Sequence, residues 1–366
     1  MRVLQCTKRS VTLMAVACVA LSACGDSGPD VPFNPTGTTE DAQAVADAFS
    51  SEAFGSFSTF SVYFDAALGT PAPVISSSAQ AFNFRRATTA GELRAAATRN
   101  ARRIADLTRA KHKSFSAETA AIPAEVAGKT FEFDGIGYVP TDRTGAPANG
   151  VRFIIYAVNP VTFEPSLPLT EVGYVQLNDL SGSNIQAARV IVVSGETTYL
   201  DYTVTATATV TGGRVTVVGF VTDGQYTANV NLRSTVNESA GFTLLYTLDV
   251  PQRDVAIDLT MSTSGLDPET SVIEIDLSMS GPNGTVSMSG QFSETGGTLA
   301  VRVNGKVFAT MTASGAGEPV ITGANGQPLS DEDAVALRNI FEITGAAFIA
   351  FDEMVLPVAI FLEPAA

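Results

Sequence analysis

The chain has 366 residues, of which 45% are hydrophobic and 16% charged, and its formal net charge is -15. This length can bury a sizeable core in one large or two ordinary domains, and the acidic balance excludes charge-driven binding to nucleic acid. The chain has a single histidine, His112, so a multi-histidine metal site is excluded and an internal Ser-His-Asp mechanism would have to use that residue.

Residues 1–24 are laid out as a lipoprotein signal sequence. A basic start with Arg2, Lys8 and Arg9 is followed by a short apolar run at residues 10–21. This run is too short to cross a bilayer, which needs about 20 residues, and it is typical of a signal-peptide core. It ends in Leu21-Ser22-Ala23-Cys24, which resembles the lipobox of bacterial lipoproteins at every position.

The lipobox resemblance implies that residues 1–23 are removed and that Cys24 is acylated by a diacylglyceryl group and by palmitate or a similar chain. Two or three acyl chains anchor a protein firmly, whereas one is marginal. Residues 24–37 contain three prolines and are expected to form the acylated start and a flexible tether. The residue after the cysteine is Gly25, which by the sorting rule of enteric lipoproteins implies the outer membrane. A plain signal peptide with a chance cysteine is the alternative.

Residues 38–115 predict a helical region that begins with a helix at 38–68. Thr38 and Thr39 are candidate caps, followed by two acids that suit the positive end of a helix. Apolar side chains recur at mostly helical spacing. They are Val45, Phe49, Phe57, Phe60 and Phe64. We interpret this line as packing on a core; a groove for acyl chains is the alternative.

A second helix is predicted at residues 88–113, and it is strongly basic. Residues 85–113 contain nine basic and two acidic side chains, and Ile104 lies on a narrow apolar line. Arg99, Arg102 and Arg103 are candidates for contact with anionic lipid or with the phosphates of lipopolysaccharide. The alternative is a solvated helix whose charge complements the acidic body of the same molecule.

Residues 116–366 predict an antiparallel β domain. The sequence at 203–210, T-V-T-A-T-A-T-V, alternates strictly between polar and apolar residues. The same alternation recurs to residue 312, interrupted by turn signals such as Gly212-Gly213 and Asn304-Gly305. One face of the sheet is therefore expected to be apolar and the other polar, with successive strands in up-and-down order. Residues 190–193 are all apolar and predict a strand buried on both faces.

A long C-terminal helix at residues 330–353 is expected to cover the apolar face of the sheet. Ser330 precedes three acids and is a candidate cap. Phe341 and Phe348 lie on one side of the helix and are expected to be buried against the sheet. Pro357 is expected to end the helix, and residues 358–362 are expected to return as a last strand.

Motifs for catalysis or cofactor binding are absent, including the phosphate loop, the dinucleotide fingerprint, HExxH, the EF-hand and G-x-S-x-G. Asp254 with Asp258, and Glu274 with Asp276, are expected to share the polar face of the sheet. Such carboxylate pairs can act on sugars, but on an exposed sheet we interpret them as solubilising groups. We therefore expect no catalytic residue, no metal, no cofactor and no enzymatic activity.

The sequence thus predicts an α+β, mainly β protein: a large curved antiparallel meander whose apolar face is covered by helices, with an N-terminal helical part. This arrangement resembles the half-barrels of bacterial lipoprotein carriers and outer-membrane lipoprotein receptors, in which helices close a concave sheet over acyl chains. The resemblance implies non-catalytic binding of a lipid or other apolar ligand at the periplasmic face of the bacterial cell envelope. The alternative is a structural or adhesive surface module whose polar face binds protein or polysaccharide. A cavity beneath the sheet favours the first function, and a solid core favours the second.

Overall fold

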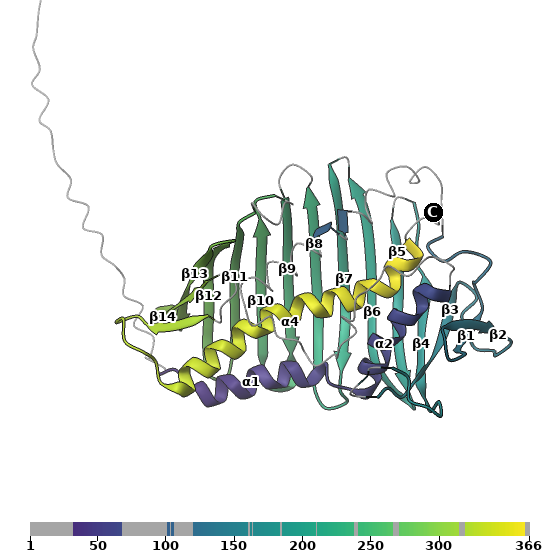
Figure 1. Ribbon diagram of the computed structural model, residues 1–366, viewed down its shortest axis with the longest axis horizontal. Coiled ribbons are helices and arrows are strands. Elements are labelled where there is room, and N and C mark those ends of the chain that lie inside the picture. The colour runs from purple at the N-terminus through teal and green to yellow at the C-terminus, as the bar shows by residue number, and fades with distance from the viewer. Residues whose placement is uncertain are drawn as a thin grey trace, which may run out of the picture. The chain divides into compact units, whose positions relative to one another are not determined.

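The structure is a computed structural model that describes residues 32–67, 101–102, 104–105, 120–159, 162, 164–183, 185–209, 211–237, 241–265, 271–314 and 319–362. The chain from Phe33 onward forms one compact unit. Within this unit the described helices lie against one large sheet (Figure 1).

Fifteen strands form a single sheet in which neighbours along the chain pair with one another, except that β3 pairs with β1 rather than with β2 (Figure 1). All pairs are antiparallel except β1 with β3, which is parallel. The strands at the two ends of the order, β15 and β2, do not pair with each other, so the sheet is open. The fold is therefore α+β and mainly β, an antiparallel meander with one face covered by helices, as the sequence predicts. The strands are β1 (Thr130–Phe133), β2 (Tyr138–Thr141), β3 (Gly150–Tyr156), β4 (Glu171–Asp179), β5 (Gln186–Ser194), β6 (Thr197–Thr209), β7 (Gly212–Thr222), β8 (Thr227–Asn237), β9 (Gly241–Val250), β10 (Val255–Thr263), β11 (Ile273–Gly281), β12 (Gly284–Ser293), β13 (Gly296–Val303), β14 (Lys306–Ala313) and β15 (Val320–Gly323).

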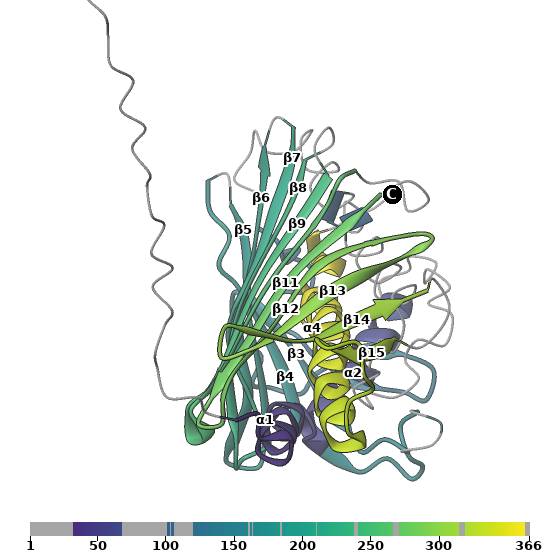
Figure 2. The same ribbon diagram turned by 90° about the vertical axis from the view of Figure 1, so that its left-hand side faces the viewer.

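One face of the sheet is apolar because the alternation of the strands stays in phase from strand to strand. Val204 pairs with Val217, which pairs with Leu232, and Leu232 pairs with Tyr246. These four side chains lie on β6 to β9 and are at most 3% exposed. A shift of one residue at any strand would turn its apolar set to solvent, so the pattern itself specifies the register. The described helices lie on this apolar face (Figure 2).

Glycine-containing pairs predict turns at residues 212–213 and 304–305, and only the second turn lies where the sequence predicts it. Asn304 and Gly305, between β13 and β14, have positive φ angles of 49° and 80°, as a tight hairpin turn of the predicted kind requires. Gly212 and Gly213, in contrast, do not form the turn between β6 and β7. They are the first residues of β7, and Gly212 already pairs with Thr209, the last residue of β6. The hairpin was predicted correctly, but the position of its turn was wrong.

Strand β5 was predicted to be buried on both faces, and this is wrong. Val190 and Val192, on the apolar face of the sheet, are 0% exposed. Ile191 and Val193, on the other face, are only partly buried. The sequence shows apolar residues on both faces, but the described helices cover only one of them.

The helix predicted at residues 38–68 is two helices, α1 (Pro35–Ala48) and α2 (Glu52–Ala67). Helix α1 begins before the predicted caps, because the Asn34 side chain accepts a hydrogen bond of 3.0 Å from the Gly37 amide. At the other end, the Ser50 hydroxyl donates to the Asp47 carbonyl oxygen at 2.7 Å. The next serine, Ser51, accepts from the Phe54 amide at 3.1 Å. The two serine hydroxyls thus end one helix and start the next.

The C-terminal helix α4 (Asp331–Leu362) is longer than predicted. Its predicted cap is confirmed, because Ser330 Oγ accepts a hydrogen bond of 3.1 Å from the Asp333 amide. Pro357 lies inside the helix, so the predicted end and the predicted return strand are both wrong. Proline removes one backbone hydrogen bond, but Val355 and Val358 beside it are at most 1% exposed. Burial of such side chains, at about 1.5–3 kcal/mol each, offsets that loss. Figure 1 shows α4 crossing the sheet from the β14 side toward β5, and α1 packs against it.

Aromatic side chains join the helices to the sheet. The ring centroids of Phe57 on α2 and Tyr202 on β6 are 6.4 Å apart, and those of Phe60 and Phe153 are 4.7 Å apart. The predicted apolar line of the first helical segment therefore packs in the core, where four of its residues are at most 2% exposed: Val45, Phe49, Phe57 and Phe60. The side chain of its fifth member, Phe64, lies outside the described part.

On α4, the predicted burial of Phe341 is confirmed. The side chain is 2% exposed, and its ring centroid lies 6.3 Å from that of Phe292 on β12, in an edge-to-face arrangement. The side chain of Phe348 is not among those that the structure describes.

Three tyrosines, Tyr138, Tyr202 and Tyr246, are at most 3% exposed and are called the buried tyrosines here. Burial raises the pKa of each phenol above its ordinary value, because a low-dielectric surrounding disfavours the anion. Tyr138 donates to the Ile154 carbonyl oxygen at 2.9 Å, and Tyr202 donates to the Met354 carbonyl oxygen at 3.0 Å. The second bond connects the sheet directly to α4.

Helix α1 is held to turns at one end of the sheet by a group that we call the Asp41 clasp, formed by Asp41, Arg253 and Asn283. Asp41 is 2% exposed. Its carboxylate accepts hydrogen bonds from Arg253 at 3.2 Å and from Asn283 at 2.8 Å. Arg253 follows β9 and Asn283 lies between β11 and β12. One carboxylate therefore connects α1 to two separate hairpins.

Candidate functional site

The middle of the apolar face contains two hydroxyl groups with no hydrogen-bond partner. Ser234 on β8 is 0% exposed, and its Oγ is unpaired. Tyr246 on β9 is 3% exposed, and none of the hydrogen bonds found among the described residues involves its hydroxyl. Ser234 pairs with Leu244, and Leu232 pairs with Tyr246. The two hydroxyl-bearing residues are therefore diagonal neighbours, about 7–8 Å apart.

A third unpaired polar group lies on the same row of the sheet as Ser234. Gln186 on β5 pairs with Ala206, Ala206 with Val215, and Val215 with Ser234. Gln186 is 7% exposed, and its Oε1 has no partner. With strands about 4.8 Å apart, Gln186 and Ser234 are separated by about 14 Å across the apolar face. We call Gln186, Ser234 and Tyr246 the interior polar track.

Small side chains surround this track on the side of β5 and β6. The two residues of β6 that face the apolar layer next to Gln186 are Ala206 and Ala208, and Ala208 is only partly buried. Alanine fills less of the layer between sheet and helices than valine or leucine would. Small side chains therefore lie in the apolar layer beside the unpaired amide of Gln186.

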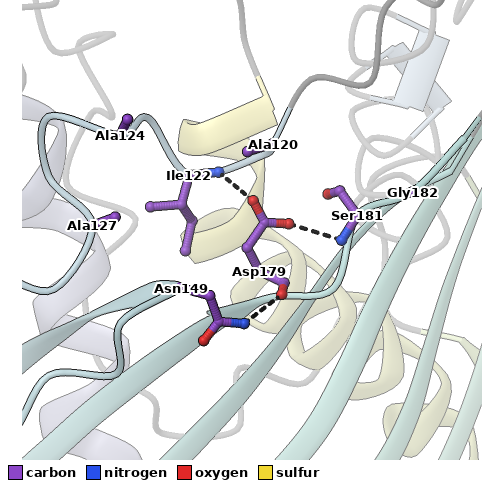
Figure 3. A pocket seen from close by; sticks show the side chains of 8 residues that line it. All are labelled: Ala120, Ile122, Ala124, Ala127, Asn149, Asp179, Ser181 and Gly182. Carbon is purple, nitrogen blue, oxygen red and sulfur yellow. Dashed lines mark hydrogen bonds between the residues drawn. The ribbon is translucent and has the colours of Figure 1, made fainter.

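A hollow of about 550 Å³ opens at the end of the same face, where β4 meets β5 (Figure 3). Asp179, the last residue of β4, borders this hollow and pairs with Ala188. Ala188 in turn pairs with Val204, so Asp179 begins the row that leads across the apolar face to Tyr246. We call this hollow the β4–β5 hollow. Its lining is formed by Ala120, Ile122, Ala124, Ala127, Asn149, Asp179, Ser181 and Gly182.

The polar groups that border the β4–β5 hollow are already engaged. The two carboxylate oxygens of Asp179 accept hydrogen bonds from the amides of Ile122 at 3.0 Å and Ser181 at 2.8 Å (Figure 3). Asn149 donates its side-chain amide to the Asp179 carbonyl oxygen at 2.8 Å. Asp179 therefore connects the segment around Ile122 to the sheet, and this carboxylate supports the wall of the hollow rather than acting as a base.

Chemically, the two features suit an elongated molecule with a few polar atoms. The hollow has mainly alanine and isoleucine walls, and the row behind it is apolar except for the interior polar track. A buried hydroxyl or amide carbonyl without a partner is costly, and in native proteins such a group usually has a bound water or ligand atom as its partner. No group of three or more His, Cys, Asp or Glu residues could hold a metal ion within the described part of the chain.

Most of the site residues predicted from the sequence fall outside the described part of the chain. Cys24, Arg99 and Arg103 lie outside the described residues, as does His112. Arg102 is in a described helical fragment and is exposed, whereas Ile104 in the same fragment is 0% exposed. This fragment therefore has one polar and one buried side, consistent with the amphipathic helix predicted there.

The acidic pairs are only partly as predicted. Asp254 has a left-handed backbone, with φ 55°, and lies in the turn before β10, while Asp258 lies within that strand. The prediction that these two share one strand face is therefore wrong, because Pro251–Arg253 forms a 3-10 turn that delays the start of β10. Glu274 and Asp276 are both exposed on β11, as expected.

Sequence reasoning missed the interior polar track, although one signal was present. In β8 the positions that face the apolar layer carry Val230, Leu232, Ser234 and Val236. The serine interrupts an otherwise apolar series, and such an interruption marks a polar group placed in a core. Tyr246 gave no such signal, because tyrosine is common in strands. Gln186 gave none either, because it precedes the apolar run at residues 190–193 that predicted this strand.

Comparison of this chain with protein-family models, with curated proteins and with solved structures finds no match in any of the three. Among the described residues, none of the helices combines the length and the apolar composition that a membrane crossing needs.

Proposed function

We propose that this protein is a lipid-anchored component of the bacterial cell envelope that binds a lipid or other apolar ligand, without catalysis, between its sheet and its helices. The observation that carries this proposal is the interior polar track, a set of unpaired polar atoms in an apolar layer. The anchor proposed at Cys24 would hold the ligand site close to a membrane, at the periplasmic face and on the outer membrane.

In a solid core, the polar atoms of the interior polar track would remain without hydrogen-bond partners. A buried polar group without a partner costs about 1–3 kcal/mol. Ser234 Oγ is fully buried and unpaired, so a solid core would bear this cost there. Its diagonal neighbour Tyr246 adds a second hydroxyl without a hydrogen bond among the described residues. Alanine and phenylalanine at these positions would avoid it with little change of volume. A ligand with an ester, carboxyl or amide group near the two hydroxyls would instead give both of them a partner.

The attachment of the helices also supports this proposal. Near its C-terminal end, α4 is bonded to the sheet through the Tyr202 hydroxyl, and Glu353 accepts a hydrogen bond of 3.0 Å from Ser58 on α2. These are side-chain contacts, and the strands keep their own ladder of backbone hydrogen bonds. The helices can therefore shift over the apolar face without breaking the sheet, as a cover over an exchangeable ligand must.

The test is native mass spectrometry of the full chain purified from bacterial membranes, with extraction and identification of any bound apolar molecule. The double variant Ser234→Ala/Tyr246→Phe is compared with the control Ser278→Ala/Tyr174→Phe, whose hydroxyls lie on the opposite face of the sheet. We expect the wild type and the control to retain ligand and the double variant to lose most of it.

Stability of the ligand-free proteins separates binding from folding. Removing two unpaired hydroxyls should leave the ligand-free double variant as stable as the wild type or more so. Added ligand should stabilise the wild type more than the double variant, because a ligand that binds only the folded state raises its stability by mass action. A wild-type protein that carries no apolar molecule, or a double variant that retains as much as the control, would overturn the proposal.

A further inference from the structure

The face of the sheet opposite the described helices has a hollow of its own, of about 460 Å³, over β7 to β10. We call it the β7–β10 hollow. On one side it is bordered by Val218, which is 52% exposed, and by the partly buried Phe220. Polar side chains from the next three strands form the rest of its border. This hollow lies on the opposite face from the interior polar track and shares no side chain with it.

The register of the strands arranges the polar groups of this hollow in two rows. One row runs from Val218 through Asn231 and Thr247 to Asp258. Along this row an amide, a hydroxyl and a carboxylate follow one another at the strand spacing of about 4.8 Å. The row beside it begins with Phe220 and continues with Asn229, Asp249 and Ala256. The small side chain of Ala256 leaves the second row open at its far end.

Most of these polar groups are available to a ligand. Asn229 donates to Asp249 across the strands, but at 3.3 Å, which is long for a hydrogen bond. Asn231 and Asp258 make no side-chain hydrogen bond and no ion pair within the described part of the chain. Arg233 is the next outward-facing residue along β8 after Asn231, and it too makes no ion pair with another described residue. The hollow therefore offers both donors and acceptors that are exposed and unengaged.

The charge of the hollow limits what it can bind. Asp249 and Asp258 are both exposed and are not neutralised by a bonded cation among the described residues, so an anionic polymer would be repelled. A purely apolar partner would leave both rows of polar atoms without hydrogen bonds. What fits is a neutral molecule with many hydroxyl groups and one less polar face, which can lie on Phe220 and Val218 while its hydroxyls reach the amides and carboxylates.

We propose that the β7–β10 hollow binds a neutral sugar chain that lies across the strands. Its hydroxyl groups bond to Asn231, Thr247 and Asp258 in turn, and the C–H face of one sugar unit packs against the Phe220 ring. This function goes beyond the binding of an apolar ligand on the other face and does not depend on it. The alternative function predicted from the sequence was polysaccharide binding by the polar face, and this proposal assigns that binding to a specific site.

The test is titration of the full chain, in detergent micelles, with neutral oligosaccharides of glucose, mannose, galactose and N-acetylglucosamine, using empty micelles as the blank. Asp258→Ala is compared with Asp276→Ala, which removes an exposed carboxylate from the same face of the next strand, outside the hollow. Asn231→Ala is a second variant within the hollow. All three residues are exposed, so folding should be preserved, and circular dichroism checks this.

We expect at least one neutral oligosaccharide to bind, and Asp258→Ala and Asn231→Ala to weaken it by about tenfold, as the loss of a hydrogen bond to an exposed polar group predicts. Asp276→Ala should bind as the wild type does. Two results would each overturn the inference: no binding of any neutral oligosaccharide, or an equal loss in Asp276→Ala. The lipid content of the same variants should not change, so failure here is distinct from failure of the proposed apolar-ligand function.

Discussion

Two adjacent carboxylates on α1, Glu40 and Asp41, share one cation and differ mainly in burial, which permits a sharp prediction. Arg253 lies 3.2 Å from Asp41 and 3.6 Å from Glu40. The side chain of Asp41 is 3% exposed and that of Glu40 is 64% exposed. We expect Asp41→Ala to destabilise the protein strongly and Glu40→Ala to have little effect.

The magnitude follows from the Asp41 clasp. Asp41→Ala removes hydrogen bonds from Arg253 and Asn283, and hydrogen bonds to a charged group contribute about 1.5–3 kcal/mol each. The side chain of Arg253 remains 32% exposed, so water can solvate it after the change, and we expect a net loss of about 2–4 kcal/mol. Glu40→Ala removes an exposed pair, which contributes about 0–1 kcal/mol. Alanine favours a helix more than either acid, so a loss cannot come from helix propensity.

The measurement is urea unfolding of the full chain, with the free energy of unfolding compared among the wild type, Asp41→Ala and Glu40→Ala. Combining each variant with Arg253→Ala gives a double-mutant cycle for each pair. The coupling of Asp41 with Arg253 should exceed about 1 kcal/mol and should change little with salt, whereas the coupling of Glu40 should be smaller and should be screened by salt. Equal small losses in both variants would refute the argument that burial, rather than proximity to Arg253, determines the strength of this contact.

Four further predictions follow from the anchor, the basic helix, the cover and the buried tyrosines. Cys24→Ala should abolish metabolic labelling with a palmitate analogue, and equal labelling of variant and wild type would exclude acylation at that cysteine. Replacing Arg99, Arg102 and Arg103 with Gln should weaken binding to anionic vesicles at low salt, since exposed charges act over about 10 Å at 0.1 M; if the unsubstituted chain does not bind such vesicles, its basic helix does not contact lipid. Phe341→Ala should cost about 3–5 kcal/mol in thermal unfolding if its site is fully packed, and no loss would mean that α4 does not cover the sheet. The buried tyrosines have pKa values raised by burial, so their contribution to stability is complete below pH about 10 and is lost as pH rises beyond it; the tyrosinate absorbance of these three, among the eight tyrosines of the chain, should therefore appear together with unfolding, and ionisation of all the tyrosines in a still folded chain would contradict their burial.

The sheet could be predicted from the sequence because each strand contains its own alternation of apolar and polar residues. The alternation around Val204 places every second side chain on one face, and the turn at Asn304-Gly305 adopts the left-handed backbone that its residue types favour. The start of α4 could be predicted for the same reason, because Ser330 caps the helix with its own side chain. Patterns within a few residues of each other can be recognised in a sequence, and in the meander almost every strand pairs with its neighbours along the chain.

Other features depend on contacts between distant segments, and only the tertiary structure decided them. Pro357 should end a helix, but the apolar side chains on both sides of it are buried, and their burial outweighs one lost hydrogen bond. In the sequence, Asp41 is an ordinary acid near the start of a predicted helix. Only the structure shows that its partners are Arg253 and Asn283, which lie more than 200 residues away. Ser234 and Tyr246 become a candidate site only because the register of β8 and β9 makes them neighbours in a layer without other partners. Local chemistry thus determined the elements, whereas burial, which no single segment determines alone, decided where the helices end and which polar groups remain unpaired.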